Sequence, residues 1–308
     1  MPLNRGWSYR EQVGPDNSGQ TVLDYLTATR LHSTQDEWRD RIDRGEGEVE
    51  GTRVHTDEVL FAGQTVAWNR PPWDEPDVPM HFDIVHEDDS LIIVNKPSGL
   101  PTMPAGGYLE HTLMTLVRAT CPEASPLHRL GRFTSGLVLF ARTKAAASLL
   151  ARAWRERAVK KTYRALGLGV TRTEMFVIDA PIGPVPHPTL GTVQAACEGG
   201  RPCHSVAFVL ERRHDQTLFG VEITTGRPHQ IRIHLAYAGH PLVGDPLYDM
   251  GGGLKHHPGL PGDGGYLLHA ERLQFKHPAT GQRMTVIAAP PPELQTHKEL
   301  VQPTAGAR

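Results

Sequence analysis

Short apolar runs separated by turn residues fill most of the chain after residue 80. The runs that have the length and the β-branched or aromatic content of buried strands are residues 91–94, 137–141, 206–210, 218–223 and 284–287. One longer stretch, residues 145–158, places Leu149, Leu150, Ala153 and Trp154 on one face of a helix. Strands outnumber helices, and this pattern predicts an α+β fold with a mixed, largely antiparallel sheet.

The first part of the chain has a different pattern, which predicts two short helices and a hairpin. Thr21 is a possible N-cap for one helix, and residues 33–36 open a second that places Trp38 and Ile42 on one face. Residues 48–54 form a strand, a turn and another strand.

A proline-rich segment separates these two parts. Four prolines between Pro71 and Pro79 exclude both helix and central strand, so the chain is extended there. We therefore predict a small domain over residues 10–70, a linker over 71–80, a main domain over 81–292 and a frayed tail over 293–308.

Composition points to a cytoplasmic protein. Hydrophobic residues make up 39% and charged residues 21% of the 308 positions. The chain has neither an apolar run of about 20 residues nor the apolar core of a signal peptide at its N-terminus. Its three cysteines cannot form a disulfide framework, which favours a reducing compartment.

Charge is unevenly distributed although the net charge is only −2. Residues 10–70 carry 7 basic and 12 acidic side chains, whereas residues 71–308 carry 24 and 22. Between residues 142 and 164 eight basic side chains stand against Glu156 alone. Such a block attracts phosphates, but it is also typical of a solvated helix face, and the charge pattern alone leaves both readings open.

Several common chemistries lack their motifs. The 17 histidines include no helical pair at metal-ligand spacing, and the glycine-rich segments lack the Gly-Lys-Ser/Thr ending of a phosphate-binding loop. Ser135 is not in the Gly-x-Ser-x-Gly context of a hydrolase nucleophile.

The stretch from His128 to Gly136 reads His-Arg-Leu-Gly-Arg-Phe-Thr-Ser-Gly. It resembles the signature of the RluA-type pseudouridine synthases, His-Arg-Leu-Asp-x-x-Thr-Ser-Gly, with Gly131 at the position of the catalytic aspartate. Further segments resemble that family in the expected order: residues 84–99, 161–165, 225–234, 239–248 and 268–270. The chain is thereby identified as a member of this family, and residues 10–70 resemble its S4-like RNA-binding domain, although they are unusually acidic.

The resemblance implies the pseudouridine synthase fold, with a central cleft, and an enzyme that isomerises uridine in structured RNA such as rRNA or tRNA. The reaction needs no metal and no cofactor, the target base is flipped out of its stack, and a monomer is the default. Among the site residues Tyr163 would contact the uracil, Arg232 would be the basic partner of the carboxylate, and Arg129 would fill the vacated stack. The other residues expected to bind RNA are His128, Arg132, Thr134, Ser135, Arg227, His229 and Gln230.

Gly131 has no side chain and cannot act as the family's nucleophile or base, so two interpretations remain open. Either another carboxylate enters the pocket, with Asp89, Asp245 and Asp249 as candidates, or the protein is a catalytically silent RNA-binding relative. In the second case Arg232 loses its charge partner and could bind a phosphate. An acid within hydrogen-bond reach of Arg232 favours the enzyme, and an empty basic cleft favours the binder.

Overall fold

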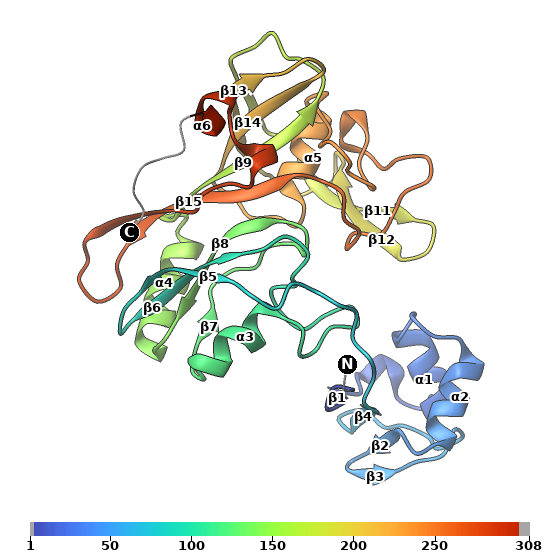
Figure 1. Ribbon diagram of the computed structural model, residues 1–308. Helices are drawn as coiled ribbons and strands as arrows, with labels where there is room; N and C mark the ends of the chain where they lie inside the picture. The colour runs from blue at the N-terminus through green and yellow to red at the C-terminus, as the bar shows by residue number, and fades with distance from the viewer. Residues whose placement is uncertain (1–2, 302–308) are drawn as a thin grey trace. The chain divides into compact units, whose positions relative to one another are not determined.

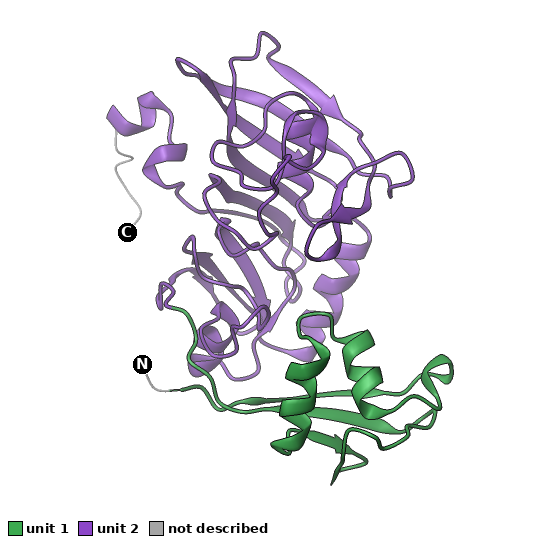
Figure 2. Cartoon of the chain, turned by 90° about the vertical axis from the view of Figure 1, so that its right-hand side faces the viewer, with its two compact units in different colours: residues 1–76 green, residues 77–308 purple. Residues whose placement is uncertain are grey.

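The structure is a computed structural model that describes residues 3–301. The chain divides into two compact units, and the division falls between Pro76 and Asp77, inside the segment predicted to be a linker (Figure 2). No helix in the described part of the chain is long and apolar enough to cross a membrane.

The first unit contains a four-stranded sheet and two short helices. In spatial order the strands are β1 (Trp7–Gln12), β4 (Thr65–Arg70), β2 (Gly47–Val49) and β3 (Thr52–Arg53). The helices are α1 (Val22–Thr29) and α2 (Gln35–Asp43), with a 3-10 turn, η1, at Pro15–Asn17. Both predicted helices and the β2–β3 hairpin are confirmed, whereas β1 and β4 were not anticipated.

Local capping and a tryptophan pair explain why these helices form. Thr21 caps α1, and Thr34 with Glu37 forms a reciprocal capping box at the start of α2. Trp38, which is fully buried on α2, meets Trp68 of β4 edge to face, with ring centroids 4.9 Å apart. The S4-like identity of this unit remains a prediction.

The second unit is built on a ten-stranded sheet. Its main path runs β10 (Met175–Ile178), β13 (Ser205–Arg212), β14 (Gln216–Ile223), β9 (Lys160–Leu168), β15 (Leu268–Lys276), β8 (Ser135–Ala141), β6 (Leu91–Lys96) and β5 (Asp83–Glu87). Strand β16 (Arg283–Ile287) pairs with β15, and β7 (Ser125–Pro126) pairs with β8. Only the β8–β15 pair is parallel among the described strands, so the predicted α+β class with a mixed, mainly antiparallel sheet is confirmed.

Helices and a separate hairpin pack around this sheet (Figure 1). The helices are α3 (Leu113–Thr120), α4 (Lys144–Arg155), α5 (Gln230–Tyr237) and α6 (His297–Val301), with 3-10 turns η2 (Met250–Gly252) and η3 (Pro292–Leu294). The hairpin consists of β11 (Ile182–His187) and β12 (Gly191–Ala196). Helix α4 packs on β8 and ends at Arg155 rather than at residue 158, because Arg157 adopts a positive φ of 56°. Helix α5 contacts β10, β12 and β13.

The described part of the tail differs from the frayed segment that was expected. Leu294 in η3 is 1% exposed, and Glu299 in α6 accepts hydrogen bonds of 2.6 and 2.7 Å from Arg164 of β9. Arg164 also pairs with Glu271 of β15 at 2.7 Å. This ion-pair cluster holds the segment up to Val301 against the sheet, and residues 302–308 lie outside the described residues.

Candidate active site

Three segments that are far apart in the sequence meet around a pocket of about 340 Å³ in the second unit. They are the loop between β7 and β8, the start of β9, and the turn that leads from β14 into α5, and the lining is completed by Trp154, Tyr266 and Leu268. The volume lies in the range of ordinary ligand pockets. Of the predicted site residues, those that line it are His128, Arg129, Gly131, Thr134, Tyr163, Arg227, His229, Gln230 and Arg232.

The turn that follows β6 holds the loop between β7 and β8, residues 127–134, in place. Lys96 is fully buried, and its ammonium group donates to the backbone carbonyls of Pro97, Leu100 and Arg132 at 2.7–2.9 Å. Gly99 N–H also donates to the Arg132 carbonyl, at 2.9 Å. Three carbonyls match the three N–H donors of an ammonium group, so Lys96 fixes the path of the loop that carries the site.

Replacing Lys96 by Met should lower the free energy of unfolding by about 2–3 kcal/mol, because buried carbonyls lose their donor. Urea unfolding would measure the change, and Lys144→Met, at an exposed position on α4, is the matched control. Equal stability of the two variants would contradict the assigned role of Lys96.

His128 anchors the loop to the sheet. Its ring stacks on Trp154 of α4 with centroids 4.7 Å apart, and its Nε2 accepts the Leu139 N–H at 3.1 Å. Burial lowers the pKa of His128 to about 3, so the ring is neutral and Nε2 is free to accept. Arg129, the next residue, is exposed at the edge of the pocket.

Two predicted RNA-binding residues of the signature lie outside the pocket lining. Arg132 donates to the hydroxyl of Tyr108, and its guanidinium lies 4.4 Å from the centre of the Phe133 ring. Ser135 donates to His269 Nδ1 at 2.9 Å, while the other ring nitrogen of His269 donates to the Ala288 carbonyl. Both side chains are therefore engaged in holding the loop and the β8–β15 pair.

Strand β9 supplies an aromatic ring and a cation. Tyr163 is 8% exposed, and burial raises its pKa to about 12, so its hydroxyl keeps its proton at neutral pH. Lys161, two residues earlier, donates to the Thr225 carbonyl at 3.1 Å, and burial lowers its pKa to about 8. Sequence reasoning did not single out Lys161 as a site residue, although it begins the Lys161–Ala165 motif.

The charge of Lys161 should make RNA binding depend on pH. Its pKa in the folded protein is below the usual value, so the ammonium is present below about pH 8 and is lost above it. Affinity for RNA should therefore fall between about pH 7 and about pH 9. Over the same pH range, the slope of log affinity against log salt concentration should become shallower by about 0.7–0.9, which corresponds to the loss of one phosphate contact.

Filter binding at several salt concentrations would measure both effects. Lys161→Met should have the weaker affinity and the flatter salt dependence at every pH in this range. A wild-type affinity that does not change with pH would rule out a charged Lys161 as an RNA contact.

Arg232 of α5 is buried and has a charge partner. Its Nε and one Nη donate to the two carboxylate oxygens of Asp245 at 2.7 and 2.8 Å, and both side chains are at most 2% exposed. The guanidinium lies between two rings, 4.2 Å from the centre of Tyr266 and 5.0 Å from that of Tyr248. In the interpretation as a silent RNA-binding relative Arg232 would lack a charge partner, whereas the structure pairs it with Asp245, the kind of contact that was expected to favour the enzyme.

Asp245 does not, however, offer a free carboxylate to the pocket. One of its oxygens also accepts the N–H groups of Leu247 and Tyr248, at 2.9 and 3.2 Å, and the residue is 1% exposed. Asp89 is exposed, and Asp249 caps η2 by accepting from Met250 N–H. In the described part of the chain no Asp or Glu lines the pocket, whereas Arg129, Lys161, Arg227 and Arg232 do.

The turn before α5 is tied down by side chains. Gln230 is 2% exposed, and its amide bonds His204 carbonyl, Ser205 and Thr225 at 2.7–3.0 Å. His229 has a left-handed φ of 58° and lies 2.8 Å from the Tyr248 hydroxyl. That hydroxyl donates to the Gln194 carbonyl, so His229 Nδ1–H is the donor to it, and Nε2 is left as an acceptor. Arg227 Nε is buried without a hydrogen-bond partner among the described residues, which leaves a donor available at the pocket.

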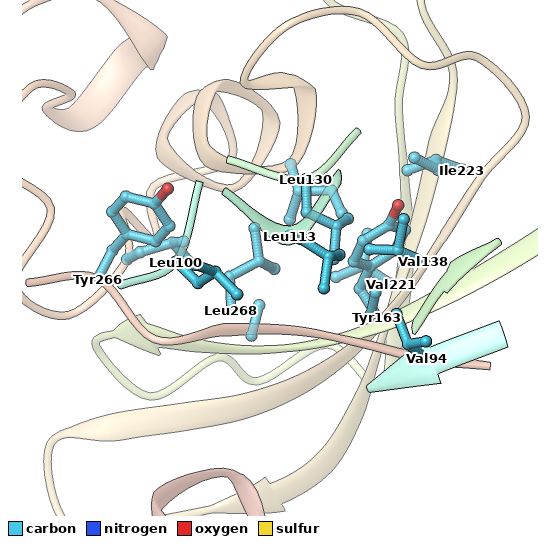
Figure 3. Close-up of a cluster of buried hydrophobic side chains, with 14 of the residues drawn as sticks. Val94, Leu100, Leu113, Leu130, Val138, Tyr163, Val221, Ile223, Tyr266 and Leu268 are labelled. Carbon is cyan, nitrogen blue, oxygen red and sulfur yellow. The ribbon is translucent and has the colours of Figure 1, made fainter. Parts of the chain in front are cut away.

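Gly131 faces a tyrosine that sequence reasoning missed. Its φ lies outside the left-handed region, so an L-residue fits the backbone there. A Cβ built on Gly131 would lie 3.0 Å from the Tyr266 hydroxyl and 3.5 Å from Thr134 Oγ1. Tyr266 is 5% exposed and lines the pocket, and Figure 3 shows its ring at one edge of the buried hydrophobic cluster. One signal for Tyr266 was present in the sequence: it is an aromatic residue two positions before the Leu268–Ala270 motif.

Among the described residues, no cluster of three or more His, Cys, Asp or Glu side chains could hold a metal ion. A family model described as RNA pseudouridylate synthase matches residues 90–237. An uncharacterized RNA pseudouridine synthase of Synechocystis is 42% identical, over 89% of this chain and 96% of the relative. The chain belongs to the RNA pseudouridine synthase family.

Other members of the family show how far the similarity extends. RNA pseudouridine synthase 5 of Arabidopsis thaliana is 35% identical, with 96% of each chain covered. Ribosomal large subunit pseudouridine synthase D of Neisseria meningitidis is 38% identical over 70% of this chain and 60% of that protein, which supports the RluA type. The solved structure of human RNA pseudouridylate synthase domain containing 1 superposes with a TM-score of 0.57 at 26% identity, over 75% of this chain and 97% of that one.

Proposed function

We propose that this protein isomerises a uridine to pseudouridine in structured RNA by binding the flipped nucleotide in the pocket. The observation that carries the proposal is the meeting of three family motifs, from the β7–β8 loop, β9 and the start of α5, around that one pocket. A pocket with four cations and several aromatic rings suits a nucleotide, which has a phosphate to neutralise and a base to stack.

The geometry supports a division of roles within the site. Tyr163 packs against the uracil, and exposed Arg129 takes the vacated place in the base stack. Arg227, with a free buried donor, and Lys161 contact phosphates. Arg232, oriented by Asp245, supplies fixed positive charge beside the reacting sugar. The remaining predicted contacts hold the loops in shape: His128, Arg132, Ser135, His229 and Gln230.

Large-subunit ribosomal RNA is the substrate that we propose first. The support is the similarity to proteins named ribosomal large subunit pseudouridine synthase D, which reaches 38% identity over 232 residues. We further propose that the protein acts as a monomer in the cytoplasm, in line with the default of its family and with its cysteine content.

Mapping of pseudouridine in RNA tests this function. RNA from cells that lack the gene should lose pseudouridine at one site or a few sites, and complementation with the wild-type gene should restore them. Complementation with Arg232→Met should not. An unchanged map in the deletion strain would contradict the proposal.

One observation favours the second candidate, a silent RNA-binding relative: no acid lines the pocket in the described residues. On that account the purified protein would bind RNA with an affinity that depends on the cations of the pocket. It would leave every uridine unchanged.

A further inference from the structure

Five side chains at this site could accept a proton, and four of them are unsuited to the role. His229 lines the pocket with Nε2 free, but burial lowers its pKa to about 3, so its ring is a weak base. Asp245 is saturated by four hydrogen bonds and does not line the pocket. Lys161 donates to the Thr225 carbonyl, and the raised pKa of Tyr163 keeps its hydroxyl protonated. The remaining group is the Tyr266 hydroxyl.

Tyr266 stands where the family's carboxylate would stand. Its hydroxyl is 3.0 Å from the position of a Cβ on Gly131, a contact tight enough that a side chain there requires the tyrosine to shift by a few tenths of an ångström. Gly131 has no side chain, and the hydroxyl oxygen of Tyr266, from the segment before β15, lies in the space beside it. In Figure 3 the hydroxyl ends of Tyr163 and Tyr266 both lie on the same side of the buried cluster as Leu130, the neighbour of Gly131.

The surroundings of Tyr266 suit an oxygen on which negative charge develops. The guanidinium of Arg232 lies 4.2 Å from the centre of its ring, and Arg232 is the residue that pairs with the carboxylate in the family. Thr134 Oγ1 is 3.5 Å from the hydroxyl, at the limit of a hydrogen bond. Arg232 shares its charge with Asp245, so the guanidinium over the ring and the Thr134 hydroxyl provide a fixed polar environment for an anionic oxygen rather than an unpaired cation.

We propose that Tyr266 is the catalytic base of this enzyme and that its hydroxyl oxygen replaces the carboxylate missing at Gly131. This inference rests on the proposed function, because it assigns the base for that reaction. The tyrosine enters the reaction as the phenolate, having released its proton to solvent.

The proposed step conserves atoms and charge. The phenolate oxygen takes the proton from C2′ of the ribose, a double bond forms between C1′ and C2′, and the bond from C1′ to N1 breaks with its electron pair going to the uracil. After the base turns, C5 attacks C1′ while C2′ takes the proton back from Tyr266, which restores the phenolate. Loss of the C5 proton to solvent and protonation of N1 then give pseudouridine.

Tritium release tests the assignment. The substrate is total RNA that carries tritium at uridine C5 and comes from cells of the same source lacking this gene. The proteins are wild type, Tyr266→Phe, Gly131→Asp/Tyr266→Phe, and Tyr237→Phe as a control on the exposed end of α5. Tyr266→Phe keeps the ring over Arg232, so RNA affinity and melting temperature should remain those of the wild type.

We expect Tyr266→Phe to lower kcat by about 100-fold or more with little change in KM, as for loss of a general base. Tyr237→Phe should match the wild type. The double variant should regain activity, since phenylalanine leaves room for the new carboxylate.

The outcomes separate the two claims. If wild type and Tyr266→Phe release tritium equally, the assignment of Tyr266 is overturned and the proposed function stands. If wild type releases none while the double variant does, the scaffold lacks a base, and both the assignment and the wild-type activity are overturned. The assignment is supported if wild type releases tritium, Tyr266→Phe loses this activity and the double variant recovers it.

Discussion

Arg232→Met should cost the protein about 3–5 kcal/mol of its free energy of unfolding, because Asp245 is left as an unpaired buried charge. Both partners are at most 2% exposed, and the pair is bidentate, so water cannot replace the lost donors. Pseudouridine formation should fall below detection even at temperatures where the variant is folded, since the pocket also loses its fixed cation.

Urea unfolding and pseudouridine assays on the same preparations would separate the two effects. Arg232→Met/Asp245→Asn removes both charges, keeps an acceptor for the Leu247 and Tyr248 N–H groups, and should recover much of the stability but none of the activity. Arg152→Met is the matched control, because its side chain is 63% exposed and its ion pair with Glu156 is long, at 4.0 Å. It should change stability by less than about 1 kcal/mol. Similar stabilities for Arg152→Met and Arg232→Met would contradict the account of the buried pair.

Gly136→Ala should prevent the second unit from folding or destabilise it by about 4 kcal/mol or more. Gly136 ends the signature and has a φ of +107°. A Cβ there would lie 2.3 Å from the Ala270 carbonyl oxygen and 2.6 Å from its nitrogen, both backbone atoms of the parallel partner strand β15. The glycine of the motif is thus required by the close approach of β8 and β15, on which the β7–β8 loop depends.

Gly281→Ala is the control that measures backbone strain without the steric clash expected for Gly136→Ala. Gly281, in the β15–β16 turn, has a φ of +70° with no atom within 4 Å of an added Cβ. Alanine there should cost only the left-handed penalty of about 1–2 kcal/mol. Thermal melts of both variants would measure the difference, and a Gly136→Ala protein as stable as Gly281→Ala would refute the packing argument.

The elements that could be predicted from the sequence are those with one buried face and local caps. Helix α2 has a capping box at Thr34 and Glu37 and places Trp38 and Ile42 on its buried side, so both its type and its start are visible locally. Helix α5 was noticed as a motif but not as a helix. It is buried from Gln230 to Ala236, so its apolar residues show no one-sided period.

The site residues that could be predicted from the sequence are those that lie within a continuous motif. The signature, the β9 motif and the α5 motif each named residues that do line the pocket, including Tyr163 and Arg232. Two features were out of reach because they depend on how distant segments meet. Asp245 could be nominated, but its saturation by backbone N–H groups could not be foreseen. Tyr266 reaches Gly131 across 135 positions of sequence, from a segment with no motif of its own.

The central claim is tested most directly by measuring pseudouridine in RNA from gene-deleted cells. The RNA is first incubated with the purified wild-type protein in the presence of a chelator. We predict that pseudouridine forms at the sites missing from the deletion strain, without added cofactor and without inhibition by the chelator, and that Arg232→Met forms none. Absence of pseudouridine with wild-type protein that binds the same RNA would contradict the claim, and the protein would then be an RNA-binding relative of the family.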